Sequence, residues 1–181
     1  MNGKTVLLIS FFTSFSLFAL AQDEEPSPAS SVSDIQRNYQ WRIQQTKLSG
    51  QYIPKDIFDA FAELNRLTDL ESRSKFQSLS ENDAARKLYF SLGRWITTNW
   101  GLYEGSRLGQ YLREAGVSHP EDQAIAIIVC WHRSLNKQDI NFKQVQEVLA
   151  AKRKKEREDR LKKMKVIKEE VVKPSPPAVK N

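Results

Sequence analysis

The strongest constraint on the fold is an unbroken apolar run from Ile125 to Trp131. By itself such a run fits either a buried strand or a buried helix segment. The residues just before it, Pro120-Glu121-Asp122, place a proline and two acids where the first turn of a helix would be, and the helical pattern continues to Leu135. A helix that is apolar on all sides must lie at the centre of its domain. The sequence therefore predicts one central helix with other elements packed around it.

Start and stop signals predict further helices around this centre. They cover residues 33–48, a segment starting at Pro54, residues 69–76, a long helix from Ser80 to Gly101, a helix from Ser106 to Gly116, and a last helix starting near Asn141 or Phe142. No pair of strands with hairpin turn residues is expected. The predicted fold class is all-α, a compact multi-helix domain with a long projecting basic helix at the C-terminus.

The first 21 residues predict a cleaved signal peptide. Lys4 precedes an apolar run that ends in Ala19-Leu20-Ala21, a small-x-small cleavage pattern. The alternative is an uncleaved membrane anchor, but the run is shorter than the ~20 residues of a span and contains hydroxyl side chains. We therefore expect an exported protein, periplasmic or extracellular, with no transmembrane span after cleavage.

Composition divides the rest of the chain into segments. These are a linker (22–32), a helical domain (33–151), a charged, solvent-exposed, coiled-coil-like helix (152–173) and a Pro-rich tail (174–181). Residues 152–181 hold 12 Lys/Arg and 5 Asp/Glu, a net +7, whereas residues 22–151 hold 15 and 17, a net −2. The basic charge thus belongs to the C-terminal segment, which argues against nucleic acid as a partner of the domain.

The C-terminal helix is predicted to dock on the domain only at its start. Phe142, Val145, Val148 and Leu149 can reach the core, and no apolar residue occurs between Lys152 and Arg160. Seven cations beyond this point are candidates for binding anionic lipid or lipopolysaccharide: Lys152, Arg153, Lys154, Lys155, Lys162, Lys163 and Lys165. Interspersed acids favour the alternative of a solvated helix.

An aromatic loop supplies the candidate ligand-binding residues Trp100, Tyr103, Ser106 and Arg107. Aromatic faces beside a guanidinium group can stack on a sugar ring or hold an anion at a helix start. The alternative is structural, with glycines that allow the turn and aromatics that fill the core. Burial of these side chains would favour the structural interpretation.

The sequence offers no convincing catalytic or metal site. His119 and His132 lack metal-ligand spacing, so neither a metal nor another cofactor is expected. Cys130 and His132 lie two residues apart, on opposite sides of a helix, and cannot form a thiol–base pair. Glu121 and Asp122 are more typical of acids that stabilise a helix start. We expect Cys130 to be a buried, inert thiol.

Residues 51–136 carry motifs that resemble a known family. The motifs are Tyr52-Ile53-Pro54-Lys55-Asp56, Gly93-Arg94-Trp95, Asn99-Trp100-Gly101-Leu102, Ser106-Arg107-Leu108, His119-Pro120-Glu121-Asp122 and His132-Arg133-x-Leu135-Asn136. This pattern resembles an uncharacterised domain-of-unknown-function family of exported Bacteroidota proteins. The resemblance implies a compact helical domain of an exported protein and no assigned activity.

Together these features predict a non-catalytic interaction module of the cell envelope, with an unidentified protein or anionic component as its partner. Two alternatives remain open at this point. One is an envelope-anion binder that acts through the basic helix. The other is an enzyme on carbohydrate or peptide that uses the aromatic loop with Glu121, Asp122 or His132.

Overall fold

The computed structural model describes residues 26–172, with side chains up to Met164. Its elements, in order, are α1 (Val32–Arg42), β1 (Lys47–Leu48), β2 (Gln51–Tyr52), α2 (Ile57–Leu67), α3 (Leu70–Gln77), α4 (Glu81–Leu88), the π-helical turn η1 (Tyr89–Gly93), α5 (Arg94–Asn99), α6 (Arg107–Glu114), α7 (Pro120–Leu135) and α8 (Phe142–Val172). The fold is mostly α-helical, as predicted. The predicted signal peptide (1–21), residues 22–25 of the predicted linker and the Pro-rich tail (174–181) lie outside the described residues.

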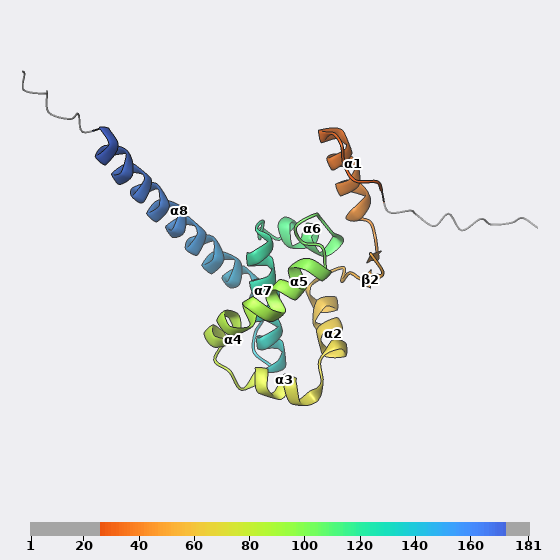
Figure 1. The fold of residues 1–181 in the computed structure, drawn as a ribbon. Coiled ribbons are helices and arrows are strands. Elements are labelled where there is room, and N and C mark those ends of the chain that lie inside the picture. Colours follow the sequence, from red (N-terminus) through yellow and green to blue (C-terminus); the bar gives the residue numbers. More distant parts are fainter. Residues whose placement is uncertain (1–25, 173–181) are drawn as a thin grey trace, which may run out of the picture.

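Helix α7 lies at the centre of the domain, as its apolar run predicts. Helices α2, α3, α4, α5, α6 and α8 all pack against it (Figure 1). Ile127 and Ile128 are fully buried, and Trp131 is nearly so. Burial of this apolar surface is the main source of stability in a domain of this size. Within residues 26–172, no helix is long and apolar enough to cross a membrane.

Short polar side chains begin four of the surrounding helices. The side chains of Asp56, Asp69, Ser80 and Ser106 each accept a hydrogen bond from the backbone N–H three residues further on. Each bond satisfies a donor that the helix itself leaves unpaired. The helix starts predicted at Asp69, Ser80 and Ser106 are confirmed. The start predicted at Pro54 is wrong, because Asp56 provides the cap and α2 begins after it.

Residues 47–52 form a small antiparallel hairpin, which corrects the prediction of a helix to residue 48 and no strand pair. Lys47 pairs with Tyr52, and Leu48 pairs with Gln51. Ser49 and Gly50 form the turn with φ of 46° and 77°. Positive φ at both central residues suits the twist of a two-residue hairpin, and glycine adopts it without steric cost. Leu48 is buried, so the hairpin pins this segment to the core.

A π-helical turn interrupts the long helix predicted between Ser80 and Gly101. The turn, η1, inserts one residue into the helical ladder, so the buried face shifts after it. The fully buried side chains are Ala84 before the turn and Ile96 after it. The predicted end at Gly101 is confirmed, with a φ of 60° just after α5.

Helix α1 attaches to the domain through side chains near its C-terminal end, although it buries no residue. The Tyr39 hydroxyl hydrogen-bonds to the Gln110 side chain, and Arg42 Nε donates to the Gly105 carbonyl at 3.0 Å. Gly105 has a φ of 96°, and a Cβ there would lie 2.4 Å from the Tyr39 ring. Only glycine therefore fits at Gly105 while Tyr39 stays in place.

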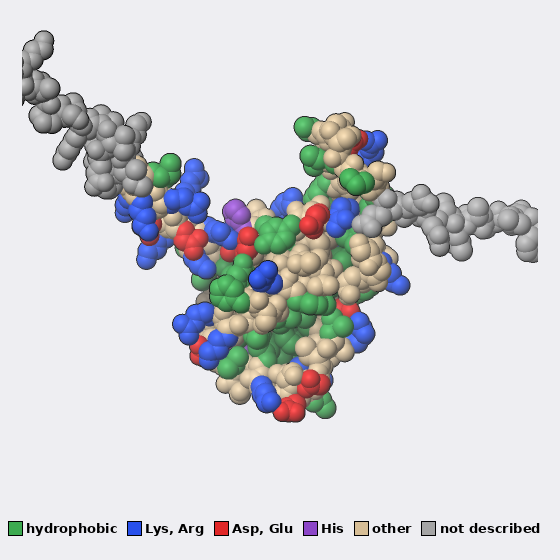
Figure 2. All heavy atoms as spheres, in the orientation of Figure 1, with side chains coloured by type: hydrophobic (Ala, Val, Ile, Leu, Met, Phe, Trp, Pro, Cys, Tyr) green, Lys and Arg blue, Asp and Glu red, His purple; other side chains and the backbone are tan. Residues whose placement is uncertain are grey.

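Helix α8 begins at Phe142, as predicted, and projects far from the domain (Figure 1). Val145 and Leu149 are buried against α7, but Val148 is 62% exposed, so its predicted docking on the core is wrong. Side chains at 145 and 149 share one helical face, and position 148 lies about 80° around the helix from the middle of that face. On the projecting part, lysine and arginine predominate over acids (Figure 2).

The thiol of Cys130 should be unreactive in the folded protein. Cys130 is fully buried in α7, and burial raises the pKa of its thiol to about 12. Since the thiolate is the reactive form, we expect a colorimetric thiol reagent to label Cys130 only after denaturation. Labelling of the native protein as fast as that of the denatured chain would contradict this placement.

Candidate functional site

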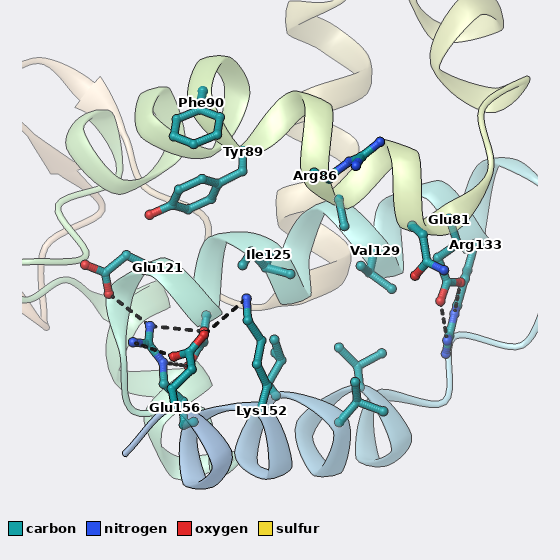
Figure 3. A pocket seen from close by; sticks show the side chains of 17 residues that line it. Glu81, Arg86, Tyr89, Phe90, Glu121, Ile125, Val129, Arg133, Lys152 and Glu156 are labelled. Atoms are coloured by element: carbon teal, nitrogen blue, oxygen red, sulfur yellow. Dashed lines mark hydrogen bonds and ion pairs between the residues drawn. The ribbon is translucent and has the colours of Figure 1, made fainter. Parts of the chain in front are cut away.

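A groove runs along α7 between α4 and α8. It encloses about 670 Å³ and is lined by α4, η1, α7 and the first turns of α8 (Figure 3). Ile125 and Val129 from α7 form its floor, and Val145 and Leu149 from α8 form part of one wall. These positions follow from the packing of α8, which covers only one side of the apolar surface of α7. Ile125 is partly exposed, whereas Val129, Val145 and Leu149 are 7%, 5% and 6% exposed, so the apolar strip of the groove is only partly open to solvent.

One end of the groove is closed by Arg133 and Glu81. Arg133 Nε lies 2.6 Å from Glu81 Oε2, and Arg133 Nη2 lies 2.9 Å from Oε1 (Figure 3). Arg133 Nη1 also donates to the Ile140 carbonyl at 2.9 Å. The Arg133 side chain is only 12% exposed. A bidentate contact of this kind fixes orientation as well as charge, so it ties α4 to α7 and to the loop before α8.

Arg153 closes the other end. Its Nε lies 2.6 Å from Asp122 Oδ2, and its Nη2 lies 3.1 Å from Asp122 Oδ1. The same Nη2 lies 3.5 Å from Glu121 Oε2. The Asp122 side chain is 6% exposed and that of Arg153 is 34% exposed. The prediction that residues 152–160 stand wholly in solvent is therefore wrong for Arg153. A buried carboxylate needs a paired cation, and α8 supplies it.

Exposed apolar and basic side chains border the groove. Phe90 and Val148 line it and are 74% and 62% exposed. Arg86 lies on the α4 side, and Lys152 extends from α8 to within 3.9 Å of Glu156 (Figure 3). The arrangement offers a broad apolar contact between charged ends. Such a surface can bind a stripe of apolar side chains on a partner. Its arginines are already paired with carboxylates of this chain and are therefore not free to bind an anion.

The residues of the aromatic loop do not converge on one cavity. Trp100 is fully buried and packs edge to face with Trp95, their ring centres 5.7 Å apart. Ser106 is buried as the cap of α6. Burial of these two side chains favours the structural interpretation of the loop.

The other two loop candidates face different surroundings. Arg107 Nε donates to the Ile53 carbonyl at 2.7 Å, and its guanidinium lies over the Tyr52 ring, 5.2 Å from the centre. Tyr103 is 57% exposed, and its hydroxyl lies 3.1 Å from Glu121 Oε1. Arg107 thus holds the hairpin to α6, and Tyr103 remains an accessible aromatic side chain.

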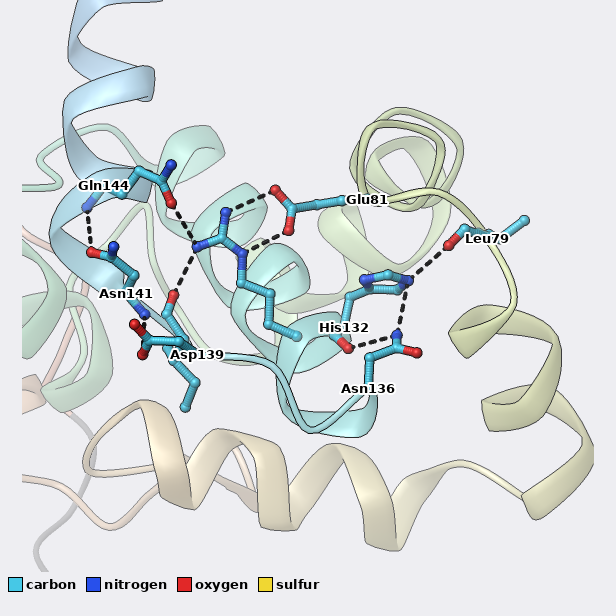
Figure 4. Close-up of polar contacts among 9 residues, drawn as sticks. Leu79, Glu81, His132, Asn136, Asp139, Asn141 and Gln144 are labelled. Carbon is cyan, nitrogen blue, oxygen red and sulfur yellow. Dashed lines mark hydrogen bonds and ion pairs between the residues drawn. The ribbon is translucent and has the colours of Figure 1, made fainter.

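His132 is buried in a structural network at the C-terminal end of α7. Its Nε2 lies 3.0 Å from the Leu79 carbonyl and 3.3 Å from Asn136 Nδ2 (Figure 4). The ring packs edge to face on Phe76. Across residues 26–164, no three His, Cys, Asp or Glu side chains are grouped so as to hold a metal ion.

The basic candidates of α8 divide into two kinds. Arg153 is engaged with Asp122, and Lys152 lies near Glu156. The other candidates with described side chains are exposed: Lys154, Lys155, Lys162 and Lys163. The side chain of Lys165 lies outside the described residues. The available positive charge thus begins where α8 leaves the domain.

No local pattern in the sequence indicates the groove. Arg133 pairs with Glu81 across 52 residues, and Arg153 pairs with Asp122 across 31. Helical spacing identifies neighbours only three or four residues apart. The only hint in the sequence is the acid pair at the start of α7 together with a cation in an otherwise solvated helix. Considered locally, that acid pair is explained by the dipole of α7, so the cation is not recognised as its partner.

Low pH should weaken the ion pair between Glu81 and Arg133 and so lower the stability of the domain. The Arg133 guanidinium lowers the pKa of the Glu81 carboxyl. A lowered folded-state pKa contributes stability above the unfolded value of about 4.3, and this contribution is lost as pH falls through the folded value. Glu81→Gln should therefore reduce the drop in melting temperature between about pH 5 and pH 3. Glu71→Gln, on the exposed face of α3, is the matched control; an equal effect of both variants would contradict the assignment.

Comparison with known proteins finds similarity to one family, and that family has no assigned function. No curated protein and no solved structure matches the chain. The match found spans α2 to α7, which includes the floor of the groove and its α4 wall, and it ends before α8. Over residues 53–135 the chain is similar to a family described as a domain of unknown function (DUF6794), which confirms the resemblance to an uncharacterised family.

Proposed function

We propose that this chain is an exported, non-catalytic interaction module that binds a protein partner in the groove between α4, α7 and α8. The observation that carries the proposal is the apolar strip of the groove, bordered by exposed Phe90 and Val148. Large exposed apolar side chains beside a concave apolar surface are typical of an interaction site. Export is supported by Lys4, the apolar run after it and Ala19-Leu20-Ala21. The motif resemblance adds the inference that related domains occur in exported Bacteroidota proteins.

Catalysis receives little support from the side chains considered for it. Trp100 is buried in the core, Asp122 is paired with Arg153, and His132 contacts a backbone carbonyl. The thiol of Cys130 is buried and holds its proton at neutral pH. These groups are each used by the fold, whereas the groove presents apolar surface that the fold leaves partly uncovered.

A matched pair of surface variants tests the groove. The mature chain, starting at Gln22, is used to capture proteins from an envelope extract. Val148→Glu places a charge in the groove without disturbing the core, and Leu70→Glu makes the same change at an exposed position of α3. We expect a partner that the unchanged chain and Leu70→Glu retain and that Val148→Glu loses. Equal capture by all three, with equal melting temperatures, would reject the groove as the site.

A second candidate function is binding to anionic envelope lipid or lipopolysaccharide through α8. The observation that favours it is the excess of exposed lysine beyond the domain (Figure 2). Each cation near an anionic surface contributes up to about 1 kcal/mol, and salt screens this attraction. Binding to vesicles with anionic lipid should then require residues 154–181 and disappear at high salt.

A further inference from the structure

The floor of the groove is as long as a short helix of about three turns. From Asp122 to Arg133 the floor helix α7 advances eleven residues, or about 16 Å, which is three helical turns. Helices α4 and α8 stand on either side of this floor, and ion pairs close both ends (Figure 3). An amphipathic helix buries its apolar side chains in such a trough at three- and four-residue spacing.

The face of α8 that borders the groove continues outward as a lysine-rich stripe. Val148 and Lys152 line the groove. Steps of three, four and three residues from Lys152 reach Lys155, Asp159 and Lys162, which share the same helical face and are exposed. A partner that follows α8 away from the domain therefore meets three lysines and one aspartate.

We propose that the occupant of the groove is an amphipathic helix of a partner protein whose outward continuation is acidic. The proposal rests on the proposed function, and it adds the chemistry of the partner. The apolar side of that helix covers Ile125, Val129 and Val148. Its acidic continuation lies along Lys155 and Lys162, and these charge pairs select an acidic partner over a basic one.

Charge at the ends of the groove favours a protein helix over a lipid. An acyl chain in the groove would place its anionic head group at one end. At one end the head group would meet Glu81 beside Arg133. At the other end it would meet Glu121 and Glu156 beside Arg153. Both arginines are already paired with carboxylates, so neither arginine is free to hold the head group. A helix distributes its side chains along its length, so its acids can lie over the lysines of α8 and away from these carboxylates.

Synthetic peptides provide the test. Each fluorescent peptide is about six turns long, with a three-turn leucine stripe followed or preceded by three turns rich in glutamate. A second set carries lysine in place of glutamate. Fluorescence anisotropy measures binding to the mature chain at low and high salt. We expect one orientation of the glutamate peptide to bind at least tenfold more tightly than both lysine peptides.

Two charge-reversed variants locate the contact. Lys155→Glu with Lys162→Glu should weaken binding of the glutamate peptide about tenfold. Lys154→Glu with Arg157→Glu changes the net charge equally on the other side of α8 and should have a much smaller effect. Circular dichroism should show unchanged helix content and melting in both, because all four side chains are exposed.

Each other outcome overturns the proposal in a recognisable way. Binding of both peptide sets that is lost only in Val148→Glu would keep the groove as the site and reject an acidic partner. If no peptide binds but Val148→Glu still abolishes capture of a partner, the groove would likewise remain the site and an acidic helix would be rejected as its occupant. Binding only to anionic vesicles, reduced equally by both charge-reversed pairs, would replace it by the lipid function. Self-association that blocks peptide binding and is lost in Val148→Glu would make a second copy the occupant.

Discussion

Replacing Trp131 with alanine is expected to lower the free energy of unfolding by about 3–5 kcal/mol. Trp131 lies on the central helix, is 2% exposed, and stacks on Phe76 with ring centres 4.6 Å apart. Its Nε1 donates to Asn65 Oδ1 at 3.1 Å. The substitution leaves a cavity where α2, α3 and α7 meet and removes the partner of a polar side chain.

Urea unfolding at 25 °C measures this effect, with Trp131→Phe as the comparison. Phenylalanine keeps an aromatic ring against Phe76 but loses the hydrogen bond to Asn65, so its cost should be clearly smaller than that of alanine. If the alanine variant fails to fold, the phenylalanine variant still reports on the site. A loss below about 1 kcal/mol for alanine would contradict the role of α7 as the centre of the core.

The local features of the fold were accessible from the sequence. The apolar run through Ile127 and Trp131 identified the central helix, because no exposed position can carry such a run. Ser80 and Ser106 marked helix starts, since a capping bond depends only on residues three apart. Such signals depend on local chemistry, and they succeeded for that reason.

Features that depend on tertiary structure were missed. The turn at Ser49-Gly50 places the serine in a left-handed conformation, which is uncommon for residues other than glycine. Burial of Leu48 holds this turn against the core. The π-helical turn likewise shifts the buried face between Ala84 and Ile96 without any proline or unusual motif to announce it. Both depend on contacts that only the folded domain creates.

Burial favours the structural interpretation of the aromatic loop for Trp100 and does not extend it to Tyr103. A cluster of aromatics beside glycines fits either a binding site or a plug in the core, and composition cannot separate them. In the structure Trp100 is fully buried and Tyr103 is largely exposed, so neighbours in one loop have different roles. The groove, in contrast, is assembled from three helices, and no single stretch of sequence contains enough of it to be recognised.

Ending the chain at Ala151 is expected to destabilise the domain, whereas ending it at Arg157 is not. A tail that stands wholly in solvent would make the two truncations equivalent. Only the shorter chain lacks Arg153, which holds the buried carboxylate of Asp122 through two hydrogen bonds. Removing one partner of a fully buried ion pair costs about 3–5 kcal/mol.

Because Arg153 is one-third exposed, solvent screening reduces this cost to about 2 kcal/mol, or roughly 6–10 °C in melting temperature. Arg153→Ala in the full mature chain should reproduce most of the loss. Asp122→Asn in the chain ending at Ala151 should recover part of it, since the amide removes the unpaired buried charge. Equal melting of both truncations would mean that α8 stabilises the domain through Val145 and Leu149 alone. The difference in melting temperature between the two truncated chains therefore shows how far along α8 its residues stabilise the domain. Beyond that point the charged side chains of α8 are available to a partner.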